Sequence, residues 1–363
     1  MVRLIFRGGA DLDTGDQQHS MIRFLLFFLP AAIALAQESG AALAPLSVPL
    51  LGYLASGSPV TVRPIAGAPG AVVLGGAIPL PDHITRVIPA PGQPFALVET
   101  AGAAQSGIVI LSLAGAGNVL AIPNTFPHSD RVAFSPSGSV AVLYSAATQQ
   151  AQVVSGLPAS PQLSRTVDLS PSGLPLVSIA VSDDAQAILA GVSDGTSGAV
   201  WTFVAGESAQ QATSAGVPSA LRFFSSKQDA IVADRGWQQV LLLPSGAAPR
   251  LLAGAIQGIR CPADVEISTD QQTVWVADTN AADSTALGRR GDVQATGPAT
   301  GRLFSINIAS GSVAIAPSSV DAASLTRLAG DSVFLLASHD GSSAGLFSSA
   351  NTAVWRLKGA GSE

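Results

Sequence analysis

Charged side chains are scarce in this sequence. Asp, Glu, Lys and Arg make up 12% of its 363 residues, about half of the share that is usual in globular proteins. Lysine occurs only as Lys227 and Lys358, and the formal net charge is −6. Proteins that bind nucleic acid need clustered basic residues to neutralise phosphates. We therefore expect no nucleic-acid partner.

A single cysteine, Cys261, leaves no possibility of an intrachain disulfide. It lies between Arg260 and Pro262, just before a predicted strand, and no histidine is near it in the sequence to activate a thiolate. We expect a buried and unreactive thiol.

No apolar run is long enough to cross a bilayer. The one continuous run, Phe24–Ala36, has 13 residues, whereas a membrane-spanning helix needs about 20. It follows the short basic segment Met21–Arg23 and ends in Ala34-Leu35-Ala36, the pattern of a secretory signal peptide. We predict a signal peptide over residues 21–36, cleavage between Ala36 and Gln37, and a secreted or periplasmic protein without a transmembrane anchor.

Composition also divides the rest of the chain. Residues 1–20 are polar and precede the basic segment of the signal, which indicates an upstream extension from a start codon placed too early. Residues 37–47 are predicted to form a flexible mature N-terminus, residues 48–358 one globular domain, and residues 359–363 a short tail. An apolar fraction of 47% is ample for a large core.

A strand–turn–strand unit repeats through this domain. Its clearest copy is Arg131–Ser145 (RVAFSPSGSVAVLYS), in which two alternating strands flank a polar turn with Gly138. The other copies are Thr85–Glu99, Ser178–Gly191, Leu221–Asp234, Asp264–Asp278 and Leu325–Ser338. The last apolar residues before the turns, from Ile88 to Leu328, are spaced by 46, 47, 43, 43 and 61 residues.

Two further short strands follow each pair, and almost no helical periodicity is present. Four strands in such a repeat are typical of an all-β protein that folds as a β-propeller. One four-stranded sheet cannot bury both of its faces, whereas sheets arranged radially cover one another. We predict a single propeller of six four-stranded blades, with seven as the alternative. Leu51–Ile65 resembles Arg302–Ala316, so we predict that the N-terminal strand completes the last blade and closes the ring.

Several repeats resemble known families. Cys261–Asn280 and Ile231–Leu243 resemble NHL repeats, with Val-Ala-Asp at the end of the second strand. The turns FSPSG and VSDDA resemble those of YVTN-like and WD40-like repeats, although the Trp-Asp dipeptide of WD40 repeats is absent. The resemblance implies a propeller and no particular function, because these families bind, scaffold and catalyse alike.

The longest loop between predicted strands supplies the candidate site. It runs from Asp278 to Gly301, and the loop His339–Ser349 of the next unit is also extended. Long loops in compact domains are functional or disordered, and in a propeller these two would emerge on one face. The arginine pair in the first loop suits a small anionic ligand. The predicted ligand- or partner-binding rim is Arg289, Arg290, Asp292, His339 and Asp340.

No catalytic, cofactor or metal site is predicted. His83, His128 and His339 fall in loops of one predicted face, as a three-histidine metal site would require, but their spacing gives no support. Asp264 and Glu266 invite comparison with gluconolactonase-type propellers, whose metal is held along the channel. The corresponding residues of other blades are Leu, Thr or Arg, so no acidic ring forms.

We therefore expect an exported, non-catalytic binding or scaffold module whose partner is an unknown protein or a small anionic ligand. The alternative is a propeller hydrolase or lyase, lactonase-like or metal-dependent, with its site at one mouth of the central channel. A third possibility is a purely structural domain of a larger surface assembly.

Export is the prediction that the sequence alone supports most directly. N-terminal sequencing of the protein from the culture medium or periplasm should begin at Gln37, because the Ala-x-Ala series ends at Ala36. Recovery of the full-length chain from the cytoplasm alone would contradict the assignment.

Overall fold

The computed structural model describes residues 48–57, 59–102, 107–113, 118–279, 301–328, 330, 332–338 and 343–357. The chain divides into the units Met1–Leu46 and Ser47–Glu363, and the fold is that of the second. The signal peptide and the segments around it lie outside the described residues, so the predictions for them stay predictions. Within the described ranges, no helix has the length and apolar character needed to cross a membrane.

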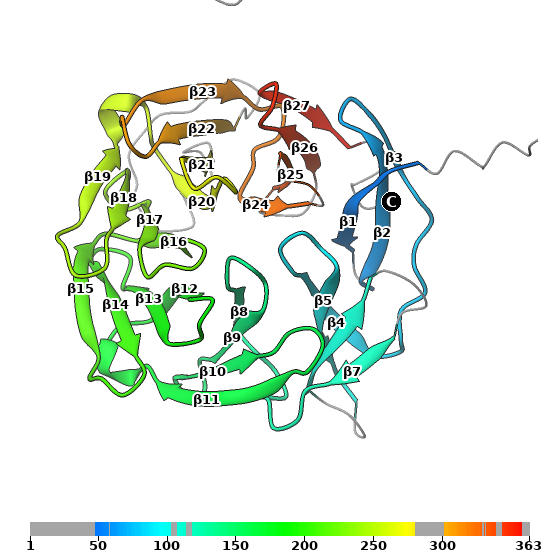
Figure 1. Ribbon diagram of the computed structural model, residues 1–363, viewed down its shortest axis with the longest axis horizontal. Helices are drawn as coiled ribbons and strands as arrows, with labels where there is room; N and C mark the ends of the chain where they lie inside the picture. The colour runs from blue at the N-terminus through cyan, green and yellow to red at the C-terminus, as the bar shows by residue number, and fades with distance from the viewer. Residues whose placement is uncertain are drawn as a thin grey trace, which may run out of the picture. The chain divides into compact units, whose positions relative to one another are not determined.

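Antiparallel sheets follow one another along the described chain (Figure 1). The first has three strands, β1 (Leu50–Ser56), β2 (Thr61–Ala68) and β3 (Ala71–Leu74). The next three sheets have four strands each: β4 (Ile84–Pro89), β5 (Phe95–Thr100), β6 (Gly107–Ser112), β7 (Val119–Ala121); β8 (Arg131–Phe134), β9 (Val140–Ser145), β10 (Gln150–Ser155), β11 (Gln162–Asp168); β12 (Leu176–Val181), β13 (Ala187–Ser193), β14 (Gly198–Val204), β15 (Gln210–Ala215).

The last three sheets also have four strands each. Their strands are β16 (Pro218–Phe223), β17 (Ala230–Asp234), β18 (Gln239–Leu243), β19 (Arg250–Ala253); β20 (Pro262–Ile267), β21 (Thr273–Asp278), β22 (Arg302–Asn307), β23 (Val313–Pro317); β24 (Ser324–Arg327), β25 (Val333–Ala337), β26 (Ala344–Ser348), β27 (Ala353–Arg356). Helix is limited, among described residues, to the single 3₁₀ turns η1 (Ser170–Ser172) and η2 (Ala255–Gln257).

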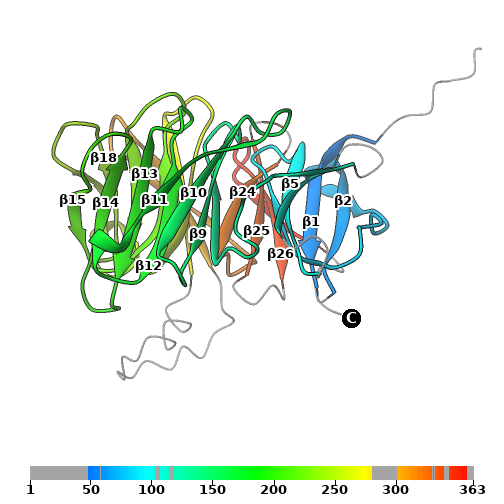
Figure 2. The same ribbon diagram turned by 90° about the horizontal axis from the view of Figure 1, so that it is seen from below.

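The sheets are arranged radially, with the first strand of each nearest the centre (Figure 1). Figure 2 shows the strands of neighbouring sheets standing side by side, with loops at both ends. The described residues thus form a single all-β propeller of seven blades.

Seven apolar clusters hold the blades together, and each one lies between two neighbouring blades. Between the fifth and sixth blades, Ile231 of β17 packs with Val265 and Phe304 of β20 and β22. Between the sixth and seventh, the ring of Trp275 packs edge-on against Phe347 at 4.8 Å between centroids. Because a blade buries each face on a different neighbour, its strands are apolar on both faces, which explains uninterrupted runs such as Val140–Tyr144.

The ring has seven blades, the alternative considered from the sequence, and not the expected six. The extra blade comes from Leu51–Ile65, which was assigned to the last blade. These residues form β1 and β2, which pair with each other, and β2 pairs with β3. The last blade takes all four strands from Ser324–Arg356, so the structure does not show closure by an N-terminal strand. Instead, Leu54 and Ile65 pack against residues of the last blade across an apolar interface.

The recurring polar turns of the sequence join the first and second strands of the blades. Ser135, Ser182 and Ser268 begin three of them, and each hydroxyl accepts the backbone N–H of the residue five positions on. The fourth residue is left-handed, which suits Gly138 in the third blade. We call the end of the propeller that carries these turns the turn face, and the opposite end the entry face.

Alanine substitutions that leave a cavity test whether the interface between the first and last blades closes the ring. Ile65 lies fully buried between the first and last blades, and Ile231 lies fully buried between the fifth and sixth. Replacing either with alanine should lower the free energy of unfolding by about 2–5 kcal/mol, measured by denaturant unfolding. If Ile65→Ala left the free energy of unfolding unchanged while Ile231→Ala lowered it, the first blade would not be part of the closed ring.

Candidate binding site at the turn face of the channel

The predicted binding rim lies outside the described residues. Arg289, Arg290, Asp292, His339 and Asp340 all fall within gaps of the description. The structure places the residues that flank both loops at the entry face: Thr279 and Gly301 between β21 and β22, and Ser338 and Ser343 between β25 and β26. The expected second loop, His339–Ser349, is wrong in its extent, because Ala344–Ser348 form strand β26. The rim therefore stays a prediction.

No group of histidine, cysteine and carboxylate residues able to hold a metal ion occurs in the described part of the chain. Of the three histidines considered as ligands, His83 and His128 are described, and His339 is not. Asp278 ends the Val-Ala-Asp signature and is almost fully buried. Its carboxylate accepts the backbone N–H groups of Arg260 and Cys261 at 2.8 and 2.7 Å. Burial raises the pKa of Asp278.

The Asp278 carboxylate thus closes the loop that leads into its own blade. Asp234 does the same in the preceding blade, where it accepts the N–H groups of Gly216 and Val217. The feature that resembles NHL repeats is therefore a structural cap in both blades. Cys261 is buried as expected, and burial raises the pKa of its thiol.

One polar cluster lies at the entry face. Glu99, at the end of β5, is almost fully buried and accepts the backbone N–H of Ser129 at 3.2 Å. His128 Nδ1 lies 3.1 Å from the same carboxylate, and Arg86 NH1 lies 3.7 Å from it. The carboxylate ties the second blade to the loop that enters the third, while the His128 side chain stays 68% exposed.

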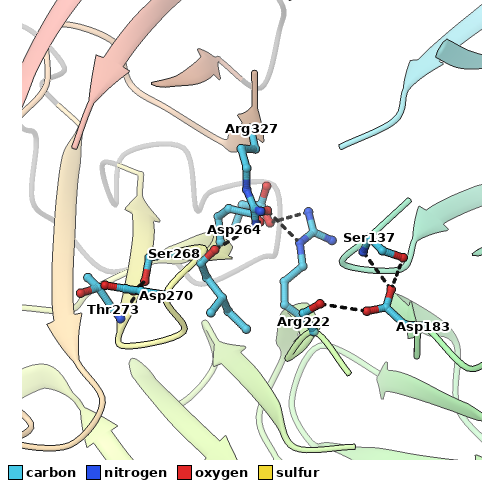
Figure 3. A network of polar contacts seen from close by, with 11 residues as sticks. Ser137, Asp183, Arg222, Asp264, Ser268, Asp270, Thr273 and Arg327 are labelled. Atoms are coloured by element: carbon cyan, nitrogen blue, oxygen red, sulfur yellow. Dashed lines mark hydrogen bonds and ion pairs between the residues drawn. The ribbon is translucent and has the colours of Figure 1, made fainter. Parts of the chain in front are cut away.

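A second polar network lies along one side of the channel, near the turn face. Glu266 of β20 binds Arg222 of β16, with 3.3 Å between Oε2 and Nε, and its other oxygen accepts an N–H of Arg327 from β24. The two guanidinium groups converge beside Asp264 (Figure 3). Asp264 Oδ1 lies 3.7 Å from Nη2 of Arg222, and the other carboxylate oxygen accepts the backbone N–H of Leu325 at 2.9 Å. Three consecutive blades are therefore joined by two arginines and two carboxylates.

Burial and charge pairing shift the pKa values of Asp264 and Arg222 in opposite directions. Burial raises the pKa of Asp264, and Arg222 offsets only part of that effect. Burial alone would lower the pKa of Arg222, but Asp264 and Glu266 outweigh it and raise that pKa. All four side chains are at most 29% exposed, so their charges compensate one another inside the channel.

Two cavities adjoin this network. The outer one, of about 360 Å³, lies at the turn face, where turns of five blades meet. It is lined by Arg222, Glu266, Arg327 and turn residues that include Pro91, Pro136, Thr269 and Gln271. The inner one, of about 180 Å³, has the same three charged residues on one side and Ile88, Val132 and Phe134 on the other. The channel is thus charged along β16, β20 and β24 and apolar along β4 and β8.

The turns around the outer cavity are linked to each other. Asp183, in the turn of the fourth blade, accepts the N–H of Ser137 at 2.8 Å and that of Ser226 at 3.2 Å, from the turns on either side (Figure 3). The Ser225 hydroxyl also donates to Asp183, and Gln271 donates to the Ser225 carbonyl. The mouth is therefore held by hydrogen bonds between blades.

The sequence carried a signal for this network. Phe224 and Ser268 make the same backbone bond at the start of their turns, so Arg222 and Glu266 occupy one repeat position. That position is Ile88 in the second blade and Ala133 in the third. The position is also uncharged in the seventh blade, where it is Thr326. A charge in a strand position that is uncharged in other blades marks a channel-lining residue, but only the structure shows that the two charges meet.

Comparisons with known proteins support the fold alone. No protein-family model and no curated protein sequence matches the chain. A functionally unknown protein from Desulfotomaculum acetoxidans superposes with a TM-score of 0.57 at 14% identity, covering 86% of this chain and 96% of that one. A Bacteroides fragilis protein with the provisional name 6-phosphogluconolactonase gives 0.54 at 12%, covering 85% and 93%. These matches show a β-propeller, and membership of the NHL or YVTN repeat families is not confirmed.

The pH dependence of stability tests whether the Asp183 carboxylate links the turns. Burial alone would raise its pKa, but hydrogen bonds from Ser137 and Ser226 outweigh that effect and lower it. A lowered pKa stabilises the fold above the unfolded-state value, near 3.9, and the contribution is lost as the pH falls through the folded-state value. Asp183→Ala should lower the free energy of unfolding by about 1–3 kcal/mol at pH 7.

The difference between wild type and Asp183→Ala should shrink towards zero as the pH falls below 3.9. Ser226→Ala is the matched control, because Ser226 binds Asp183 through its backbone N–H. A difference that is independent of pH would show that the Asp183 charge does not stabilise the mouth.

Proposed function

We propose that this chain is an exported, non-catalytic binding module whose ligand sits at the turn-face mouth of the channel. The observation that carries the proposal is the mutual pairing of the charges around the outer cavity. A general acid or base must be free to exchange a proton with its substrate. Glu266 is instead held by two arginines, and Asp264 by Arg222 and a backbone N–H.

The shape of the mouth supports binding in the same way. A cavity of about 360 Å³ falls at the low end of the range for small-ligand sites. Its walls come from turns that hydrogen bonds fix between blades, so little ordering of the protein opposes association. A small molecule, or one short segment of a protein partner, fits a site of this size.

The alternative function is hydrolysis of a lactone at the same mouth. It is favoured by the provisional name that structural neighbours from Bacteroides fragilis and Bacteroides uniformis carry, 6-phosphogluconolactonase. In that case, Arg222 or Arg327 would stabilise the oxyanion. The predicted rim with Arg289 and Arg290, which would bind a small anionic ligand, remains a separate proposal for the entry face.

A pair of threonine substitutions distinguishes the two faces. Thr269 is an exposed residue that lines the outer cavity, and Thr148 is an exposed residue between β9 and β10 at the entry face. Thr269→Trp should occlude the mouth, whereas Thr148→Trp should leave it open. Both substitutions are at the surface, so both proteins should keep the wild-type melting temperature.

The measurement is native mass spectrometry of the protein purified from its own host, together with an assay of lactone turnover. We expect a bound mass in wild type and in Thr148→Trp, its loss in Thr269→Trp, and no turnover in any of them. Loss of the bound mass in Thr148→Trp alone would move the site to the entry face. Lactone turnover that Thr269→Trp abolishes would replace the binding function with the hydrolase.

A further inference from the structure

Two side chains that line the outer cavity each carry a buried polar atom that the protein leaves without a partner. Arg327 Nε and Gln271 Oε1 are both buried and make no hydrogen bond, and both side chains line this cavity. A buried donor or acceptor without a partner is costly, and such groups in native proteins usually bind a ligand, an ion or a water. Of these two orphan atoms, Arg327 Nε is a donor and Gln271 Oε1 is an acceptor.

The turn itself sets the backbone conformation at Gln271. Gln271 has φ +57°, and Gln93, Gly138 and Ala185 occupy the same turn position in the second, third and fourth blades with φ +54°, +76° and +61°. The turn therefore places the Gln271 side chain beside the cavity that it lines.

The charge of the site argues against an anion. Arg222 and Arg327 are already matched by Asp264 and Glu266, and the side chains of these carboxylates are only 15% and 13% exposed. An anion on the unpaired Arg327 Nε would add a negative charge beside two carboxylates that the two guanidinium groups already match, which is unfavourable in a largely buried place. A neutral ligand leaves the ion pairs intact.

From these observations we infer that the ligand of the turn-face cavity is an uncharged secondary amide. Its carbonyl oxygen would accept the hydrogen bond of Arg327 Nε, and its N–H would donate to Gln271 Oε1. The proline rings of Pro91 and Pro136 line the same cavity and offer apolar surface to the planar group. Both orphan atoms are covered in the free protein, and side-chain rotations of the kind common on binding expose them to the ligand.

The inference rests on the proposed binding function and specifies the chemistry of its ligand. A secondary amide can come from a peptide backbone or from an N-acetylated sugar. In both, one planar group carries the acceptor and the donor on opposite sides. The cavity is too small for more than a short segment of either.

Ligand-observed NMR titrations of the mature protein test the chemistry. N-acetylalanine N-methylamide represents the peptide and N-acetylglucosamine represents the sugar. Glucose lacks the amide, and acetate and inorganic phosphate carry the charge. Ligands of this size bind well-formed sites with a Kd on the order of 1 mM. We expect at least one amide to bind in this range, and glucose, acetate and phosphate to bind at least about tenfold more weakly, since one lost hydrogen bond accounts for such a factor.

Gln271→Met should weaken amide binding at least about tenfold because it removes the acceptor. Gln272→Met is the matched control, because that side chain is exposed and next in sequence, and it should leave the affinity unchanged. The melting temperatures of both variants show whether the fold is kept. If Gln271→Met unfolds, Arg327→Lys replaces it, since lysine keeps the charge but has no donor at Nε.

Binding of only the peptide or only the sugar supports the inference and identifies the source of the amide. Binding of acetate or phosphate as tight as that of the amides overturns it, while the proposed binding function survives. The inference is also overturned if no amide binds, or if Gln271→Met and Gln272→Met bind equally well. The proposed function itself fails only by the separate comparison of Thr269→Trp with Thr148→Trp.

Discussion

Apolar packing between blades is the interaction on which the rest of this structure depends. Among the described residues, no strand is shared between sheets, and the first and last blades pack through side chains such as Leu54, Ile65, Leu335 and Leu346. Each of the seven interfaces buries a cluster of apolar side chains, and burial contributes roughly 25 cal/mol per Å² of apolar surface. Strand residues are therefore committed to the ring, and polar chemistry is confined to the channel and the two faces.

This constraint gives the polar groups of the channel their character. Arg222, Glu266 and Arg327 replace apolar residues at the inner edge of three blades, where they are largely removed from water. Charges in such a place persist only when they are paired. Their pairing fixes three blades relative to one another and makes the mouth of the channel rigid and close to neutral. A rigid, neutral and partly enclosed mouth suits recognition of an uncharged ligand more than acid–base catalysis.

The propeller and its repeat could be predicted from the sequence because each blade repeats local chemistry. The serine of FSPSG and VSDDA caps its own turn, and Asp234 and Asp278 cap the loops into their own blades. The number of blades could not be predicted, because Leu51–Ile65 carries only the strand–turn–strand pattern and lacks the capped turn. Pairing of β2 with β3, and not the local pattern, makes it a separate blade.

The candidate site could not be predicted from the sequence, because it also depends on contacts between blades. Arg222 and Arg327 are 105 positions apart in numbering and meet only because three blades converge on Glu266. Trp275 is buried against Phe334 and Phe347, whereas Trp237 is 52% exposed. Position in a repeat decides which face a residue occupies, and contacts between repeats decide what it meets there.

The central claim is that the turn-face cavity holds a neutral ligand on Arg327 and Gln271. A high-resolution crystal structure of the protein purified from its own host tests it most directly. We expect density in the cavity within hydrogen-bond distance of Arg327 Nε and Gln271 Oε1, with the Arg222–Glu266–Arg327 pairs intact. Ordered water alone on both atoms, or a closed cavity in which the protein itself pairs them, would contradict it.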